Sequence, residues 1–375
     1  MKQTLPLKYR PKYLRDIIGQ DVLVQTLKNS IKYDRIANAF LLTGSHGIGK
    51  TSTARIIAAL LNCLNRADCE PCGKCRSCIE IFTSSHPDIM EIDAASNTGV
   101  DNIRTIIDNT SYLPNYASYR IYIIDEVHML SISAFNALLK TLEEPPKNII
   151  FILATTDLKK VPKTIVSRCQ RFHLKRMRDD ILTNHLKNIC KKEEIIIEDD
   201  GLSLIIQSAN GSVRDALILL EHITLYSIDK NIDLNIIREV LGLSDINDIE
   251  KMLHLIIQSD MSEVLILFEK LYSFGIDINS LFKEIADLLS VKIKELVIKK
   301  ESTNLDILMR LWQAIFKGFN DLNIAPDLYV AAEMILIRMC CLAKMPSIDE
   351  ILEKNPNTEN DNIFDALKKI FPSGN

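Results

Sequence analysis

Residues 44–51 constrain the fold of this chain more than any other stretch. They read Gly-Ser-His-Gly-Ile-Gly-Lys-Thr, the P-loop pattern, in which small residues let the backbone curl so that successive N–H groups point at a phosphate. Lys50 can reach the β- and γ-phosphates of a nucleotide, and the Thr51 hydroxyl can bind Mg²⁺. The predicted phosphate ligands are Gly44, Ser45, His46, Gly47, Ile48, Gly49, Lys50 and Thr51.

The flanking sequence distinguishes a P-loop from an idle glycine turn, which can imitate it. Residues 39–43 read as a short buried strand, and residues 51–61 read as a helix rich in Ala, Ile and Leu. A strand, a glycine loop and a helix in this order place an anion at the helix N-terminus, where unpaired N–H groups and the helix dipole favour it. The context therefore supports a nucleotide site.

The composition is that of an ordinary globular protein, with 25% charged and 47% apolar residues. A length of 375 residues suggests two or three domains. The first eight residues lack the apolar core of a secretory signal, and no stretch reaches the ~18 uncharged apolar residues that span a bilayer. We expect a cytoplasmic protein with no membrane partner.

The net charge of −4 conceals two halves of opposite sign. Residues 1–178 hold 25 Lys and Arg against 16 Asp and Glu, a balance of +9, whereas residues 179–375 hold 20 against 33, a balance of −13. The two halves therefore suit different partners, and nucleic acid suits only the first. Uneven charge on a solvated surface explains the asymmetry equally well at this stage.

Short apolar runs alternate with helical patterns in the first half of the chain. We expect strands at 39–43, 89–92, 120–124 and 148–153, and helices at 21–33, 51–61, 98–107 and 133–142. This order predicts a parallel sheet covered by helices on both faces. Beyond residue 178 we find no convincing strand, and helices are expected at 179–192, 200–209, 213–227, 247–258, 261–274, 279–299, 304–317 and 326–343, before a loosely ordered tail.

Asp125 and Glu126 follow the strand expected at 120–124, and ligands of open α/β sheets bind just outside such strand ends. Asp125 is a candidate Mg²⁺ ligand, directly or through water, and Glu126 is a candidate base that polarises the water attacking the γ-phosphorus. An acidic turn after a strand is common, but the upstream P-loop favours the functional interpretation. His128 is expected to pack or hydrogen-bond locally rather than to act in catalysis.

Three further polar positions are candidates for a role in the site. Residues 154–157 end a strand, and a threonine hydroxyl there can touch the γ-phosphate, although threonine is also a common strand and turn residue. Arg168 and Arg214 lie in or near expected helix starts, and arginine can stabilise transition-state charge, often from the adjacent subunit of an oligomeric NTPase. Taken alone, either arginine is more often a surface ion-pair former.

Nine cysteines are unevenly distributed, and five of them fall within residues 63–78. The spacing Cys63-x₈-Cys72-x₂-Cys75-x₂-Cys78 offers four thiolates, which suit a tetrahedral and therefore structural Zn²⁺ site. Cys69 is a fifth thiol, which we treat as a spare that can compete with Cys63. Reduced free thiols are the alternative explanation, and nothing else in the chain suggests the redox work of an iron–sulfur cluster.

Together these motifs resemble the gamma/tau subunit family of bacterial DNA polymerase III, the ATPase of the sliding-clamp loader. The resemblance covers nearly the whole chain, and a zinc insert inside an AAA+ module is close to diagnostic. The matching segments, in family order, are 8–11, 44–51, the four cysteines of 63–78, 125–128, 136–146, 155–156, 167–169 and 211–215.

The resemblance implies a multi-domain architecture and a role for each motif. The implied parts are an α/β P-loop AAA+ ATPase domain at 1–177 with a zinc insert at 63–78, an all-α lid at 178–242, an all-α collar that oligomerises at 243–345, and a short tail at 346–375. In the family, the ATPase sites lie between subunits of a heteropentamer. By resemblance, Arg168 is the finger that reaches the neighbour's nucleotide, Arg214 the lid sensor and Thr156 the γ-phosphate sensor. Arg10, Pro11 and Ile18 are expected near the adenine.

The implied cofactors are ATP, Mg²⁺ and Zn²⁺, and the implied partners are delta-type and delta-prime-type subunits, the sliding clamp and primer–template DNA. With ATP bound, the assembly is expected to open the clamp and hold DNA, and hydrolysis then releases the closed ring. Two other functions stay open. One is a non-catalytic stator similar to the delta-prime subunit, which typically lacks an intact P-loop. The other is a small-molecule phosphotransferase, in which a lid, a collar and a trans-acting arginine have no purpose.

The long form of the family carries a C-terminal extension that tethers the polymerase and the replicative helicase. This chain ends soon after the expected collar. We therefore expect either a short, gamma-like product or a lineage without these tethers.

Overall fold

The computed structural model describes residues 3–96, 98–227, 231–244, 246–299 and 305–345. By its internal contacts the chain divides into two compact units, Met1–Ile237 and Arg238–Asn375. The expected tail at 346–375 lies outside the described residues. The finer division into an ATPase domain, a lid and a collar, with boundaries after 177 and 242, stays a prediction.

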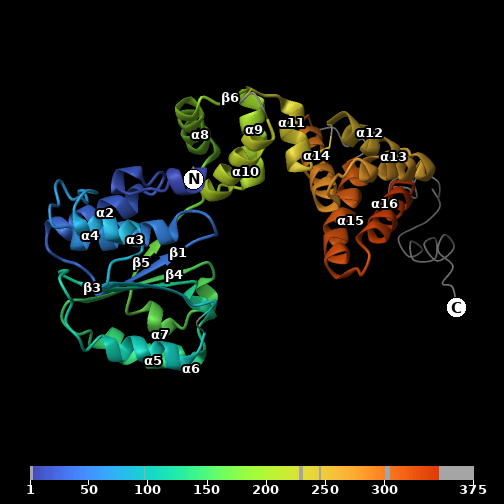
Figure 1. Ribbon diagram of the computed structural model, residues 1–375. Coiled ribbons are helices and arrows are strands. Elements are labelled where there is room, and N and C mark those ends of the chain that lie inside the picture. The colour runs from blue at the N-terminus through green and yellow to red at the C-terminus, as the bar shows by residue number, and fades with distance from the viewer. Residues whose placement is uncertain (1–2, 97, 228–230, 245, 300–304, 346–375) are drawn as a thin grey trace. The chain divides into compact units, whose positions relative to one another are not determined.

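The first unit is built on a five-stranded sheet whose paired strands are all parallel, in the order β2-β3-β4-β1-β5 (Figure 1). The four expected strands are confirmed, with bounds β1 Ala39–Thr43, β2 Ile89–Asp93, β3 Arg120–Asp125 and β4 Ile149–Thr155. We did not expect β5, Gln170–His173. Phe172 is the only buried residue of β5, because this strand lies at the edge of the sheet. Without an apolar run, β5 does not show the sequence pattern of a buried strand.

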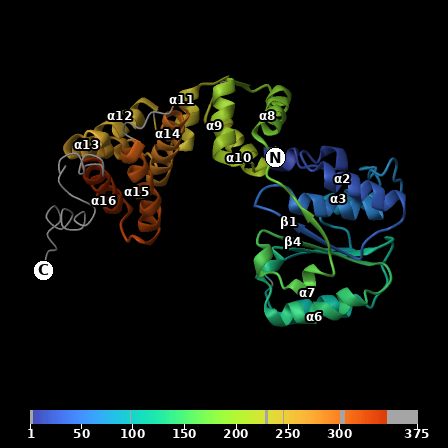
Figure 2. The same cartoon turned by 180° about the vertical axis from the view of Figure 1, so that it is seen from behind.

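Helices cover both faces of this sheet, as predicted (Figures 1 and 2). Because strand side chains alternate, Phe40 and Leu42 of β1 pack among residues of α2, α3 and α4, whereas Leu41 packs on the other face among residues of α5, α6 and α7. The helices are α1 Leu5–Lys8, α2 Asp21–Lys32, α3 Lys50–Asn62, α4 Arg76–Phe82, α5 Val100–Asn109, α6 Ile132–Glu143 and α7 Lys163–Val166, with 3-10 turns η1 Leu14–Asp16, η2 Val127–Met129 and η3 Leu158–Lys160.

Three further helices complete the first unit, and a fourth spans the division between the two units. They are α8 Asp179–Glu193, α9 Asp199–Ala209, α10 Val213–Tyr226 and, across the division between the units, α11 Leu234–Leu241. The expectation of no strand beyond residue 178 was wrong. Two-residue strands β6, Ile196–Ile197, and β7, Asn231–Ile232, form a parallel pair. A strand of two residues is too short to show the alternation that identifies one in a sequence.

The second unit is helical throughout its described residues. Its helices are α11 from Arg238 onward, α12 Ile246–Ile257, α13 Met261–Ser273, α14 Ile278–Lys299, α15 Leu305–Ile324 and α16 Leu328–Ala343. Helix α15 runs past the expected end at 317, because Gly318 lies against α16 rather than ending the helix. A Cβ at Gly318 would come within 2.9 Å of Ile335. No described helix combines the length and apolarity needed to cross a bilayer.

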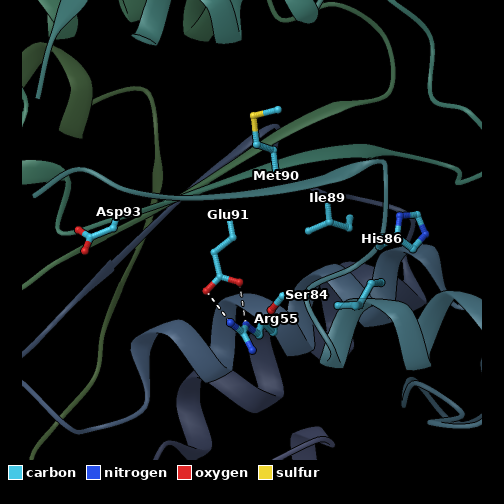
Figure 3. A pocket seen from close by; sticks show the side chains of 8 residues that line it. Arg55, Ser84, His86, Ile89, Met90, Glu91 and Asp93 are labelled. Carbon is cyan, nitrogen blue, oxygen red and sulfur yellow. Dashed lines mark hydrogen bonds and ion pairs between the residues drawn. The ribbon is translucent and has the colours of Figure 1, made fainter. Parts of the chain in front are cut away.

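The edge strand β2 is tied to α3 by an ion pair (Figure 3). Both guanidinium nitrogens Nε and Nη2 of Arg55 donate to the Glu91 carboxylate at 2.8 Å. A pocket of about 490 Å³ lies beside this pair. It is lined by Arg55, Ile81, Ser84, His86, Ile89, Met90, Glu91 and Asp93, so it contains none of the site residues expected from the sequence.

Candidate functional site

The P-loop curls between β1 and α3 as the sequence predicts. Gly47 and Gly49 have φ values of +69° and +98°, a region that residues with side chains disfavour, and a Cβ on Gly47 would clash with the Ser212 hydroxyl. Lys50 Nζ folds over the loop and donates to the carbonyl oxygens of Gly44 and Ser45 at 3.1 and 3.0 Å. Burial lowers the pKa of Lys50, although Glu126 and Asp125 oppose that shift. The glycine backbone and the Lys50 bonds together define the curled shape of the loop.

The two candidate magnesium ligands face each other across the strand ends. The Thr51 hydroxyl, at the start of α3, donates to Oδ2 of Asp125 at 2.5 Å. Oδ1 of Asp125 accepts from the backbone N–H of Glu126 at 2.9 Å. Hydroxyl and carboxylate oxygens are the donors that Mg²⁺ takes in P-loop proteins, so these residues fit that ion.

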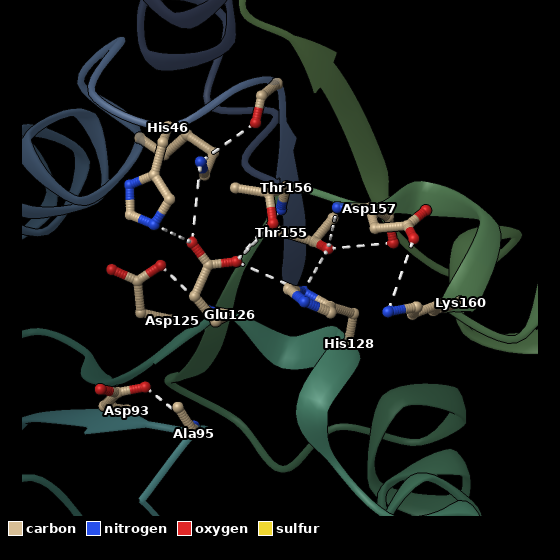
Figure 4. Close-up of polar contacts among 12 residues, drawn as sticks. His46, Asp93, Ala95, Asp125, Glu126, His128, Thr155, Thr156, Asp157 and Lys160 are labelled. Atoms are coloured by element: carbon tan, nitrogen blue, oxygen red, sulfur yellow. Dashed lines mark hydrogen bonds and ion pairs between the residues drawn. The ribbon is translucent and has the colours of Figure 1, made fainter. Parts of the chain in front are cut away.

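The carboxylate of Glu126 connects the end of β3 to the end of β4 (Figure 4). Its Oε2 accepts from the N–H and the hydroxyl of Thr156 at 3.2 and 2.9 Å. Its Oε1 lies 4.0 Å from Lys50 Nζ and 3.7 Å from His46 Nε2. The candidate base, the P-loop lysine and the candidate γ-phosphate sensor are therefore within one cluster.

A cavity of about 940 Å³ opens above the P-loop, within the first unit. Twelve expected site residues line it, namely Arg10, Pro11, Ile18, His46, Gly47, Ile48, Gly49, Lys50, Thr51, Asp125, Glu126 and Arg214. Arg214 is the second residue of α10, and its backbone N–H donates to the Gly47 carbonyl oxygen at 3.2 Å. Gly44, Ser45 and Thr156 do not line the cavity, but they contact Lys50 or Glu126, which do.

The sequence did not predict the residues that line the rest of the cavity, away from the P-loop. They come from α8, α10 and the residues around α1, and include Tyr9, Met177, His185, Leu217, Ile218, Glu221 and His222. Tyr9 and Met177 lie outside helices, and His222 is exposed, so no helical pattern groups these residues. Which residues meet a ligand depends on tertiary packing, so the sequence held no local signal for them.

Two consecutive residues of the N-terminal segment, Tyr9 and Arg10, bond to different helices beside the cavity. Arg10 Nε donates to the Ser52 hydroxyl at 3.1 Å, and burial together with the nearby Arg55 lowers the pKa of Arg10. The Tyr9 hydroxyl donates to Oε1 of Glu193 at 2.5 Å. Burial and this bond raise the pKa of Tyr9 to about 12. The segment therefore joins helix α3 to helix α8.

Arg168 lies apart from this cavity. It follows the C-terminal end of α7, so the expectation that it lies near a helix start was wrong, whereas Arg214 does lie at one. Its guanidinium donates to the Thr164 carbonyl oxygen at 2.7 Å and pairs with Glu143 at the end of α6. Its side chain is 31% exposed, so the guanidinium remains partly open to solvent.

The four cysteines Cys63, Cys72, Cys75 and Cys78 converge at one point. Their sulfur atoms all lie within 4.8 Å of one another. A tetrahedral Zn²⁺ with bonds of about 2.3 Å would hold its sulfurs about 3.8 Å apart, so the cluster has the dimensions of a metal site. Cys78 is buried and the other three are partly buried. The predicted clustering of these four cysteines is confirmed, and the cluster could hold a metal ion.

Backbone N–H groups donate to the sulfur atoms of this cluster, an arrangement that favours negatively charged thiolates. The N–H of Cys72 donates to the Cys63 sulfur at 3.2 Å, and that of Cys75 to the Cys72 sulfur at 3.3 Å. N–H donors, led by that of Lys74, lower the pKa of Cys72 to about 6, whereas burial raises the pKa of Cys78. Cys69 is separate, since its thiol points to the Lys28 carbonyl oxygen at 3.7 Å.

Comparison with protein families covers the chain from residue 19 to residue 354 in three parts. The family described as DNA polymerase III, delta subunit, matches 19–178, and the clamp loader subunit ATPase lid domain of DNA polymerase III matches 181–222. Domain III of DNA polymerase III subunits gamma and tau matches 232–305 and 291–354.

Relatives of similar length decide between these families. DNA polymerase III subunit gamma of Buchnera aphidicola subsp. Baizongia pistaciae is 38% identical over 363 residues, which cover 91% of this chain and 98% of that protein. The chain belongs to the DNA polymerase III gamma/tau family. The suspected resemblance is thus confirmed, and so is the predicted fold class of this gamma/tau chain, a parallel-sheet AAA+ module followed by helical regions.

Longer gamma/tau proteins match over part of their length. DNA polymerase III subunit tau/gamma of Haemophilus influenzae is 36% identical over 95% of this chain and 54% of that protein. DNA polymerase III subunit tau of Escherichia coli is 36% identical over 90% of this chain and 55% of that protein. This gamma/tau chain therefore spans about half the length of these two relatives. Among solved structures, the Thermotoga maritima RuvB Holliday junction branch migration motor aligns with 66% of this chain and 79% of that one, at 19% identity and a TM-score of 0.47.

Proposed function

We propose that this chain is the ATP-hydrolysing subunit of a replicative clamp loader, which opens a sliding clamp and loads it onto primed DNA. One observation carries the proposal. A single cavity is lined by the P-loop, by Asp125 and Glu126, and by Arg214 of α10. A phosphate cradle, a metal ligand, a base and a lid cation are the parts that nucleotide hydrolysis needs together.

Each part of the cavity would act on ATP in a defined way. The P-loop N–H groups and Lys50 would bind the β- and γ-phosphates, and Thr51 and Asp125 would hold Mg²⁺, which neutralises phosphate charge when bound. Glu126 would accept a proton from the attacking water. Thr156 would sense the γ-phosphate. Its place in the site is supported by its hydroxyl, which lies 2.9 Å from the carboxylate of Glu126. Arg10, Pro11 and Ile18 would contact the adenine.

Two features support an assembly rather than a solitary enzyme. Arg168 lies outside the cavity of its own chain and is partly exposed, as a finger that serves a neighbouring subunit has to be. The match of 232–305 and 291–354 to gamma and tau domain III supports a collar from about residue 243 that joins subunits. We place the chain in a heteropentamer with delta-type and delta-prime-type subunits, acting on cytoplasmic DNA.

The remaining predicted ligands have supporting roles. The Cys63, Cys72, Cys75 and Cys78 cluster would hold a structural Zn²⁺ that orders residues 63–78. The net charge of +9 in residues 1–178 would attract DNA through its phosphates, contacts that do not read the base sequence. DNA binding by the assembly should therefore weaken steeply as salt rises, and a salt-independent affinity would contradict a phosphate contact.

A non-catalytic stator is the second candidate, because the match over residues 19–178 is to a family described as the delta subunit. Substitution of Lys50 by alanine distinguishes the two roles. A motor subunit should bind ATP, and Lys50→Ala should weaken binding at least about tenfold, because a charge-assisted phosphate contact is lost. Lys32→Ala, an exposed change in α2, is the control. A wild-type chain that binds no ATP would indicate a stator.

Glu126→Gln tests the chemistry separately from binding. The amide keeps the shape of the side chain but cannot take a proton, so the full chain assembled with its partner subunits should bind ATP normally and hydrolyse it at least about a hundredfold more slowly. Single-turnover hydrolysis with clamp and primed DNA present measures this. Unchanged turnover would remove Glu126 from the role of base.

A further inference from the structure

His128 contacts the candidate base, although we expected it only to pack or hydrogen-bond locally (Figure 4). It lies in the turn η2, two residues after Glu126, and its side chain is 11% exposed. Its Nδ1 is 3.3 Å from Oε2 of Glu126 and 3.1 Å from the hydroxyl oxygen of Thr155. One ring nitrogen thus faces two side chains of the site.

The other hydrogen bonds of Thr155 assign the proton between these atoms. Thr155 has one hydroxyl proton, which it donates to the Asp157 carbonyl oxygen at 3.2 Å. The hydroxyl oxygen of Thr155 accepts from the Asp157 N–H at 3.1 Å. An ionised carboxylate can only accept. With the Thr155 proton on the Asp157 carbonyl oxygen, both neighbours of Nδ1 are acceptors, and this arrangement assigns the proton of the ring to Nδ1, 3.1 Å from the Thr155 oxygen and 3.3 Å from Oε2 of Glu126.

The two oxygens of Glu126 are in different surroundings. Oε2 accepts from the N–H and the hydroxyl of Thr156, and Nδ1 of His128 lies 3.3 Å from the same oxygen. Oε1 points to the P-loop side, with Lys50 Nζ at 4.0 Å. Glu126 also has φ +44°, a left-handed conformation that costs free energy in any residue but glycine. The fold therefore fixes the direction of this carboxylate.

We propose that His128 is a positioning residue, whose Nδ1–H holds Oε2 of Glu126 so that Oε1 is the oxygen presented to the attacking water. The inference rests on the proposed function, in which Glu126 is the base. In that step the water oxygen bonds to the γ-phosphorus, the bond from the γ-phosphorus to the bridging oxygen of ADP breaks, and the water proton passes to Oε1. His128 donates throughout and does not exchange its proton.

Two substitutions of His128 distinguish a role in positioning Glu126 from a role in filling space. In His128→Asn the side-chain amide can donate from near the place of Nδ1, whereas in His128→Gln it reaches the place of Nε2, away from Glu126. Assembled with partner subunits, clamp and primed DNA, the Gln variant should hydrolyse ATP about tenfold more slowly and the Asn variant less than about threefold. The affinity of both for a fluorescent ATP analogue should stay within about twofold of wild type. His254→Asn, an exposed change in α12, is the control.

A measurement without nucleotide tests the same claim. In the full chain labelled with ¹⁵N-histidine, with His128→Gln used for assignment, Nδ1 of His128 should carry a proton. An unprotonated Nδ1, or equal slowing in the Asn and Gln variants, would overturn the inference. Slow hydrolysis by Glu126→Gln with normal hydrolysis by His128→Gln would overturn it while leaving the proposed function intact. Normal hydrolysis by Glu126→Gln would overturn both.

Discussion

The Thr51 hydroxyl and Oδ2 of Asp125 lie 2.5 Å apart, although the two residues are 74 positions apart in the chain. The contact joins the first turn of α3 to the end of β3, so the two proposed magnesium ligands come from elements that the sheet core holds in place. A metal that replaces the shared proton would find both oxygens already on the same side.

Thr51→Ala should therefore impair hydrolysis more than nucleotide binding. Removing one metal ligand weakens the neutralisation of charge in the transition state, and we expect kcat to fall about a hundredfold and the Mg²⁺ requirement to rise. Steady-state ATPase assays across a magnesium titration measure both effects. Thr26→Ala is a matched control, since the Thr26 hydroxyl bonds only the Val22 carbonyl oxygen of its own helix. Equal activity of the two variants at low magnesium would exclude Thr51 as a ligand.

Arg168→Ala should lower hydrolysis only in the assembly. Its guanidinium pairs with Glu143 of the same chain and lies outside the cavity of that chain, so loss of the side chain leaves the local site unchanged. Fingers supplied by a neighbour contribute about a thousandfold or more, which is the expected loss when partner subunits are present. Comparing ATPase rates of the isolated chain and the reconstituted complex tests this. A matching deficit in the isolated chain would show that Arg168 acts on its own nucleotide.

Cys75→Ser should remove the metal from the insert while sparing ATP binding. Changes outside the ligand set cost metal sites about 10–100-fold in affinity, so loss of a ligand should cost at least about a hundredfold. Metal analysis of the purified chain, followed by a chelator titration, gives the affinity. Cys69→Ser is the control, because the Cys69 thiol points to the Lys28 carbonyl oxygen rather than into the cluster. Absence of metal from the wild-type protein would refute a zinc site here.

Local sequence patterns were enough to predict most of the fold and the phosphate-binding half of the candidate site. Residues 39–43 and the P-loop are recognisable because their chemistry depends on neighbours in sequence. The other half depends on register between distant segments. His128 meets Thr155 where the ends of the neighbouring strands β3 and β4 lie side by side, yet this contact leaves no local pattern in the sequence. Such residues become visible only once the sheet is assembled.

Asp88 is a buried carboxylate that the sequence did not predict, for the same reason. It lies just before β2 with its side chain fully buried, and the backbone N–H groups of Asn115, Tyr116 and Ala117 donate to it at 2.7 to 3.2 Å. Nη2 of Arg120 is 3.5 Å away. Asp88 thus holds the loop before β3 against the start of β2.

Asp88→Asn should destabilise the first unit by about 2–4 kcal/mol, because a buried charge that accepts several bonds is replaced by a group with fewer acceptors and unwanted donors. Burial alone would raise the pKa of Asp88, but the three N–H donors together lower it below its ordinary value of 3.8. A lowered folded-state pKa contributes stability that is present above pH 3.8 and is lost as the pH falls through the folded value. Urea titrations at pH 7 and in acid should show wild type losing part of its advantage over Asp88→Asn as the carboxylate becomes protonated, while the exposed change Asp108→Asn has little effect at pH 7. An advantage that persists undiminished to the most acid pH at which the protein folds would show that shape, and not charge, makes Asp88 stabilising.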